Sequence, residues 1–242
     1  AMLMAAGIEI PKKVFAHGWL LVGGEKMSKS KLTGIAPSDI TDHFGVDAFR
    51  YYFLRAIPFG SDGSFSWEDM SARYTSELAN DFGNLASRLA AMIEKYCGGK
   101  IPAVAKDATL AQSLQETVEK ADKAMVALDF QGGINAVMDY CKQVNGYVTI
   151  KEPWILAKDP ANQAILEEVL YNTAESLRAL AVLLHPVMPA TTEILWEALG
   201  AKASLGEIGK QEISKVATWG QLPQGATVTK TPVLFPRLEV KE

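Results

Sequence analysis

The 242-residue chain has few cysteines, no long apolar run and little net charge. Its two cysteines, Cys97 and Cys141, lie in stretches with helical periodicity, which fits reduced thiols in a cytoplasmic protein and excludes a four-cysteine zinc knuckle. No run approaches the ~20 apolar residues of a membrane-spanning helix, so we expect no membrane association. The net charge of −4 argues against a general nucleic-acid coat protein and leaves room for an RNA binder with a local basic or aromatic patch.

The N-terminus also lacks the basic region of a signal peptide. Residues 1–10 instead predict the end of a helix closed by Gly7, as though the chain began in the middle of a domain. We therefore expect a fragment whose N-terminal half is missing.

Three lysines and two serines at 26–31 directly follow Gly23-Gly24 and an apolar stretch. Glycines let a backbone bend sharply, and lysines two or three residues apart can converge on one polyanion. Residues 14–22 are β-branched and aromatic, which predicts one or two buried strands leading into the loop. A strand followed by a phosphate-handling loop is typical of the carboxyl edge of an open α/β nucleotide-binding sheet. The alternative is a solvated lysine-rich turn.

A short α/β segment is predicted next, between residues 36 and 66. Pro37 marks one helix start, and Asp47 is expected to cap a second helix. Arg50 and Arg55 fall off the apolar stripe of that second helix, so we expect them to be solvated or near phosphate.

From residue 67 to about 199 the pattern is almost wholly helical, with a possible break near 81–83. Apolar residues recur at steps of three and four in 110–128, 134–148 and 165–184, which predicts an antiparallel helical bundle. The chain is therefore expected to be mainly α.

Two polar features of the bundle have the chemistry of an RNA contact. Asn84 and Arg88 are four residues apart and share one helix face; asparagine and arginine are side chains that read base edges and phosphates. Pro153 is expected to start a new turn and project Trp154 sideways as a stacking platform for an unpaired base, and Asn145 is a weaker candidate nearby. The alternatives are an ordinary polar helix face and a tryptophan that only anchors the core.

The string Lys26-Met27-Ser28-Lys29-Ser30 resembles the signature loop of class I aminoacyl-tRNA synthetases. The Asn84/Arg88 helix and Pro153-Trp154 resemble the methionyl-tRNA synthetases within that class, and the resemblance extends over essentially the whole chain. It implies the end of a Rossmann-type α/β catalytic domain at 1–35, a stem-contact segment at 36–66, an α-helical anticodon-binding domain at 67–216 and a tail at 217–242 that packs back on the body.

The resemblance also implies the roles of individual residues. Lys26 and Lys29 would be catalytic and bind ATP, with Ser28 shaping the loop and His17 near it, either as an ATP contact or as a packed histidine. The side chains implied for reading the CAU anticodon are Asn84, Arg88, Asn145, Pro153 and Trp154. His185 is expected to be structural.

By the same resemblance, the substrates would be methionine, ATP with Mg²⁺, and the tRNA for methionine. Any zinc of the family would bind upstream, and no metal site is expected in this chain. The family's His-x-Gly-His element and amino-acid pocket also lie upstream, so we expect that this chain cannot activate an amino acid alone. Some family members carry a further C-terminal domain that dimerises or binds tRNA, and this sequence ends at Glu242 without one, so we expect a monomer. The alternatives are a non-catalytic tRNA-binding module and a different class I synthetase.

Overall fold

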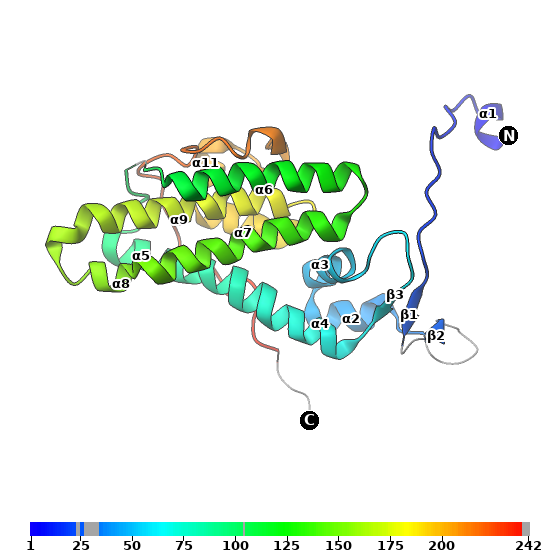
Figure 1. Ribbon diagram of the computed structural model, residues 1–242, viewed down its shortest axis with the longest axis horizontal. Coiled ribbons are helices and arrows are strands. Elements are labelled where there is room, and N and C mark those ends of the chain that lie inside the picture. The colour runs from blue at the N-terminus through cyan, green and yellow to red at the C-terminus, as the bar shows by residue number, and fades with distance from the viewer. Residues whose placement is uncertain (23–24, 27–33, 104, 239–242) are drawn as a thin grey trace.

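The computed structural model describes residues 1–22, 25–26, 34–103 and 105–238. Figure 1 shows long helices packed side by side, with a thin N-terminal segment extending away from them. The helices up to residue 97 are α1 (Met2–Ala5), α2 (Pro37–Phe44), α3 (Val46–Ala56), α4 (Trp67–Arg73), the π-helix η1 (Tyr74–Gly83) and α5 (Asn84–Cys97). The later ones are α6 (Ala108–Val126), α7 (Phe130–Lys151), α8 (Pro153–Leu156), η2 (Pro160–Asn162), α9 (Gln163–Leu184), α10 (Pro189–Ala198), α11 (Ala201–Leu205), η3 (Ile208–Lys210) and η4 (Ile213–Lys215).

These elements fit the mainly α prediction. As predicted, the first helix is followed by Gly7 in the left-handed conformation, at φ 66°. Within the described ranges, no helix is both long enough and apolar enough to cross a membrane.

A small sheet joins the N-terminal segment to the body. It contains β1 (Leu20–Val22), β2 (Glu25–Lys26) and β3 (Gly63–Phe65) in the order β2-β1-β3. β1 pairs antiparallel with β2 and parallel with β3, with Leu20 opposite Gly63. Gly18 is needed just before this sheet, because a Cβ there would collide with the backbone of Ser61.

The prediction of buried strands over residues 14–22 is wrong for most of that stretch. Only Leu20–Val22 is a strand, and the residues before it are largely exposed, with Val14 at 85% and Trp19 at 62%. The reason is pairing: the ladder with β3 begins at Leu20, and residues 14–19 have no neighbouring strand in the described part of the chain.

The prediction that Asp47 caps the second helix is also wrong. α3 begins after Gly45, whose φ of 85° favours glycine, and no side chain of the described residues caps that end. Asp47 lies in the first turn and is buried, and its Oδ2 accepts a 2.6 Å hydrogen bond from the backbone N–H of Thr191. The carboxylate thus satisfies a free N–H near the start of α10, a helix distant in sequence.

The two arginines of α3 are held by the protein. Arg50 is exposed as predicted, but its guanidinium donates to the carbonyl oxygens of residues 186–187 at 2.8 and 2.9 Å. For Arg55 the prediction is wrong, because its side chain is only 13% exposed and lies 3.1 Å from Glu77. Glu77 also accepts a 2.6 Å hydrogen bond from the Tyr51 hydroxyl and lies 3.3 Å from Arg73. These contacts join α3 to η1.

The helix over residues 67–97 changes type where a break was expected. α4 passes directly into the π-helix η1, which ends at Gly83, and α5 follows without interruption. Tyr74, Leu78 and Phe82 recur at steps of four and are all buried. One apolar face therefore continues from η1 into α5, which carries Leu85, Leu89 and Ile93.

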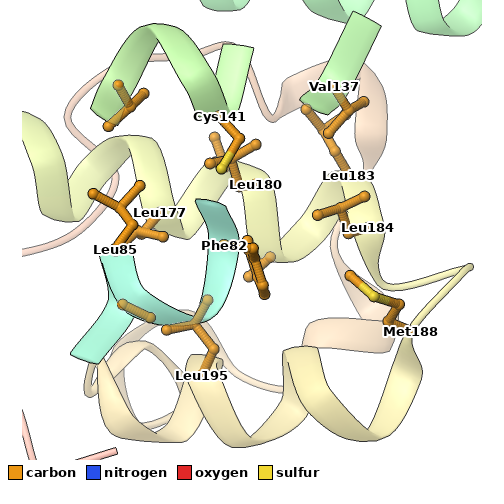
Figure 2. Close-up of a cluster of buried hydrophobic side chains, with 14 of the residues drawn as sticks. Phe82, Leu85, Val137, Cys141, Leu177, Leu180, Leu183, Leu184, Met188 and Leu195 are labelled. Atoms are coloured by element: carbon orange, nitrogen blue, oxygen red, sulfur yellow. The ribbon is translucent and has the colours of Figure 1, made fainter. Parts of the chain in front are cut away.

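The bundle is built around α9. Every residue from 171 to 184 is buried, because α5, α6, α7 and α10 all contact this helix. Figure 2 shows the side chains that meet there, among them Phe82, Cys141, Leu180 and Leu195. The predicted periodic helices over 110–128, 134–148 and 165–184 are confirmed as α6, α7 and α9.

Residues after 216 run back over the helices. The indole Nε1 of Trp219 donates to the Ala105 carbonyl at 2.8 Å, and Phe235 is buried in the common core. Tyr74 donates from its hydroxyl to the Pro236 carbonyl at 2.8 Å. These contacts hold the C-terminal residues on the body.

Candidate nucleic-acid interface

Asn84 lies in the first turn of α5, and Arg88 lies at the start of the second turn. Asn84 is the first residue of the helix and is exposed, and Arg88 follows four residues later, partly buried. The spacing places both side chains on one helix face. The guanidinium carbon of Arg88 lies 5.3 Å from the ring centroid of Trp154, so the structure brings together residues 66 positions apart (154 − 88).

The corner between α7 and α8 gives Trp154 its position. Glu152 adopts a left-handed conformation (φ 45°, ψ 57°), and Pro153 is the first residue of α8. A residue before proline is disfavoured in the right-handed helical region, so the long helix ends here and a new one begins. The expected turn at Pro153 is confirmed, and Trp154 packs partly against the hydrophobic core beside α5.

The polar atoms of this site have few partners within the protein. Among the described residues, neither the Asn84 amide nor the Arg88 guanidinium makes a hydrogen bond or ion pair, and the Trp154 indole N–H has no acceptor. Trp196, which is fully buried, and Trp219, which is partly buried, do have one, since each donates to a backbone carbonyl at 2.8 Å. We refer to Asn84, Arg88 and Trp154 as the tip site.

A cation over an indole face is attractive, and the arrangement orders both side chains. The same stack covers part of the surface that was expected to be an open platform for a base. A base that binds at Trp154 would therefore stack on the guanidinium or displace it. Either way, a base that binds at Trp154 meets Arg88.

Asn145 is held by the fold. Its amide nitrogen donates to the carbonyl oxygen of Asp81 at 2.9 Å and to that of Cys141 at 3.1 Å. The first bond ties α7 to η1, so the donor expected to face RNA is already used within the protein. An RNA contact through Asn145 stays a prediction. Such a contact would be made by the side-chain oxygen, which can accept a hydrogen bond.

A second cation–aromatic pair near the corner was not predicted from the sequence. The Lys151 ammonium lies 5.6 Å from the ring centroid of Tyr147, one turn back on α7. Burial raises the pKa of Tyr147 to about 12, and its hydroxyl accepts a hydrogen bond from the Asn172 amide. Lys151 is exposed and adds positive charge two residues before Pro153. The feature of the sequence that could have predicted this pair is the four-residue spacing between Tyr147 and Lys151, which places them on one helix face.

Much of the lysine loop falls outside the described residues. This applies to Ser28 and Lys29, while the backbone of Lys26 pairs with Leu21 in the sheet. His17 does not lie in a strand, contrary to expectation. It is exposed, with its Nδ1 2.8 Å from the Gly18 carbonyl oxygen and its ring stacked on Phe59 at 5.9 Å.

His17 and Phe59 line a cavity of about 180 Å³ together with other, mostly apolar residues at the end of the N-terminal segment. His185, by contrast, is bonded to the Thr192 hydroxyl at 2.9 Å, in agreement with its expected structural role.

Two protein families match the chain. Residues 1–90 match the family "tRNA synthetases class I (M)", and residues 107–227 match "Anticodon-binding domain of tRNA ligase". The second match includes α6 to η4, and the first ends inside α5, after Asn84 and Arg88.

Curated relatives agree with these families. The methionine–tRNA ligase of Streptomyces coelicolor is 61% identical over 248 residues, and that of Bacillus subtilis is 42% identical over 246 residues. Both alignments include all of this chain, which spans 46% and 36% of the two relatives' lengths. The methionyl-tRNA synthetase of Mycobacterium tuberculosis in complex with methionyl-adenylate has a similar fold. Its TM-score is 0.84 at 34% identity, covering 97% of this chain and 46% of that one.

Proposed function

The chain belongs to the methionyl type of class I tRNA synthetases and carries the anticodon-binding domain of a tRNA ligase, and on this premise we propose that it is the anticodon-reading part of a methionine–tRNA ligase. The observation that supports this most directly is the tip site. Arg88 and Trp154 are stacked, Asn84 lies one turn before Arg88, and their polar atoms are free of partners in the described chain.

The tip site has the chemistry to read an unpaired base. The Asn84 amide offers a donor and an acceptor to a base edge, and the Arg88 guanidinium offers a flat cation for stacking or for hydrogen bonds. The Trp154 ring adds a stacking surface, worth ~1–3 kcal/mol per base. We propose that these side chains contact the CAU anticodon and that Pro153 keeps the ring in place.

For the whole enzyme, we propose ATP-dependent ligation of methionine to its tRNA. The methionine carboxylate attacks the α-phosphate of ATP, and pyrophosphate leaves. Lys26 and Lys29 would stabilise the negative charge that develops on the leaving group, with Ser28 shaping the loop and His17 near the nucleotide. Mg²⁺ would accompany the ATP. The family resemblance of the loop supports these roles.

The proposal has further parts that rest on the same resemblance. We expect a cytoplasmic monomer that needs the remaining half of the enzyme for amino-acid activation. Methionine-dependent pyrophosphate exchange by the isolated chain would contradict this expectation. In a full-length enzyme, Lys29→Ala should slow that exchange and leave the binding of an RNA stem-loop unchanged.

The direct test uses an RNA stem-loop with a CAU loop and a second one with the loop scrambled. We expect the chain to prefer CAU, and Trp154→Ala to weaken binding to it by ~1–3 kcal/mol. Trp154→Phe keeps an aromatic face and should retain much of the affinity. Equal binding of the two loops, or no effect of Trp154→Ala, would overturn the proposed role of the tip site. If the loops are distinguished but the full-length enzyme shows no exchange, the alternative of a non-catalytic tRNA-binding module would be favoured.

A further inference from the structure

A small polar cavity of about 130 Å³ lies between α9 and the segment 210–221. Charged side chains dominate its lining: Arg178 comes from α9, and Lys210, Glu212 and Lys215 come from the segment across it. The volume is several times the ~30 Å³ that a water molecule takes up in the liquid, so a small polar ligand fits.

Arg178 is the deeply buried member of this set. Its side chain is 1% exposed, and its Nε and Nη2 lie 3.0 and 2.9 Å from Oε1 of Glu175. Nη2 also donates to the Val216 carbonyl at 2.8 Å. The remaining nitrogen, Nη1, has no hydrogen-bond partner in the part of the chain that the structure describes. A buried cation with a free donor therefore borders a cavity.

The other charges of the cavity leave a positive balance. Glu175 neutralises Arg178, and Glu212 neutralises Lys215 at 2.8 Å. Lys210 forms no ion pair with any described residue. One ammonium thus stays uncompensated in the cavity lining that Lys210 shares with Arg178, and the Lys215 ammonium adds further donors. Strong donors and excess positive charge favour an oxyanion.

We propose that this cavity is a binding site for a phosphate group, held by Arg178 Nη1, Lys210 and Lys215. The site is separate from the tip site and does not depend on the proposed function. Two sources supply the same chemistry: free inorganic phosphate and the phosphodiester backbone of RNA. Among the described residues that line the cavity, Glu212 is the one carboxylate, and it opposes binding.

The first test is titration of the chain with inorganic phosphate. Calorimetry and the broadening of the ³¹P resonance measure the binding. Lys210→Gln removes the uncompensated charge and should weaken phosphate binding about threefold to tenfold, as for the loss of one partly exposed charged contact. Lys230→Gln is the matched control, because Lys230 is also exposed and lies outside the cavity lining. Glu212→Gln has the opposite expected sign and should tighten binding.

Thermal unfolding of each variant separates ligand binding from folding. The Lys210 side chain makes no hydrogen bond or ion pair with the described residues, so its substitution should leave the melting temperature unchanged. The proposal is overturned if phosphate does not bind, or if Lys210→Gln binds as tightly as the parent chain. An equal loss in Lys230→Gln would likewise show that the ion binds elsewhere or diffusely.

Binding experiments with the two RNA stem-loops show whether the phosphate group comes from RNA or from free phosphate. If the backbone occupies the cavity, phosphate should compete with RNA, and Lys210→Gln should weaken both loops equally, because a phosphate contact carries no sequence information. If only free phosphate binds, RNA affinity should not change. Either result supports the site, and Trp154→Ala, which addresses the tip site alone, should leave phosphate binding intact.

Discussion

The molecule contains two polar clusters that differ in how their groups are paired. In the middle of α9, Glu175 and Arg178 are 0% and 1% exposed, and both carboxylate oxygens are used. They accept from three consecutive backbone N–H groups at 220–222 as well as from Arg178. At the tip site, Asn84, Arg88 and Trp154 are partly or fully exposed and make no hydrogen bond within the described chain.

Apart from Arg178 Nη1, which has no partner among the described residues, the buried pair is used by the fold, whereas the tip site is left open to a ligand. Burying a charge is unfavourable unless it is paired and hydrogen-bonded, so the α9 pair persists because the C-terminal segment closes over it. Exposed groups need no internal partner, and those of the tip site keep their hydrogen-bonding capacity for a ligand. Substitutions in the two clusters should therefore affect different measurements.

The largest effect is expected from Glu175→Gln. The substitution keeps the shape of the side chain but leaves Arg178 buried without a counter-charge, so the free energy of unfolding should fall by about 3–5 kcal/mol. Urea unfolding measures this, with Glu212→Gln, in an exposed pair, as the control expected to change by less than about 1 kcal/mol. Similar losses in both variants would remove the distinction between the buried pair and the surface pair.

Arg88→Ala should produce the reverse pattern. It removes the cation from the tip site, so binding of the CAU stem-loop should weaken by about 1–3 kcal/mol, while the free energy of unfolding changes by less than about 1 kcal/mol. Arg237→Ala, at an exposed arginine outside the tip site, is the control and should alter neither quantity. A stability loss without a binding loss in Arg88→Ala would assign the stack to folding alone.

Asn145 has a structural hydrogen bond and a predicted RNA contact, so its substitution shows which of the two roles it has. Asn145→Ala deletes the bond to the Asp81 carbonyl and should lower the free energy of unfolding by about 1–2 kcal/mol. Its effect on RNA binding should be smaller than that of Arg88→Ala. A binding loss as large as that of Arg88→Ala, at unchanged stability, would restore Asn145 to the RNA contact predicted from the sequence.

The smallest effect concerns pH. Burial raises the pKa of the Cys141 thiol to about 12, whereas a cysteine in an unfolded chain titrates near ~8.5. Below that pH both states hold the proton. Above it the unfolded state loses its proton first, so the free energy of unfolding should fall by about 0.7 kcal/mol between about pH 8 and about pH 9. Cys141→Ala should be less stable at every pH, but its free energy of unfolding should lack this part of the fall with pH. If the free energies of unfolding of the two proteins fell equally between about pH 8 and about pH 9, the raised pKa of the Cys141 thiol would be contradicted.

Local patterns in the sequence predicted much of the fold. Helices α6, α7 and α9 follow from apolar residues at steps of three and four, and the start of α8 follows from Pro153. The failures involve long-range partners. Residues 14–19 look like a strand but have no described strand to pair with, and Asp47 resembles a cap of its own helix yet bonds to Thr191 at the start of α10.

The sequence by itself determined the periodic helices, the helix end at Glu152 and the residue types of the tip site, because propensity and spacing act over one or two turns. Only the tertiary structure decided which polar groups are paired. It placed Arg88 over Trp154, gave the Asn145 donor to Asp81, and enclosed Glu175 and Arg178 beneath the C-terminal segment. These outcomes depend on packing between segments far apart in the chain, where burial determines whether a polar group needs an internal partner.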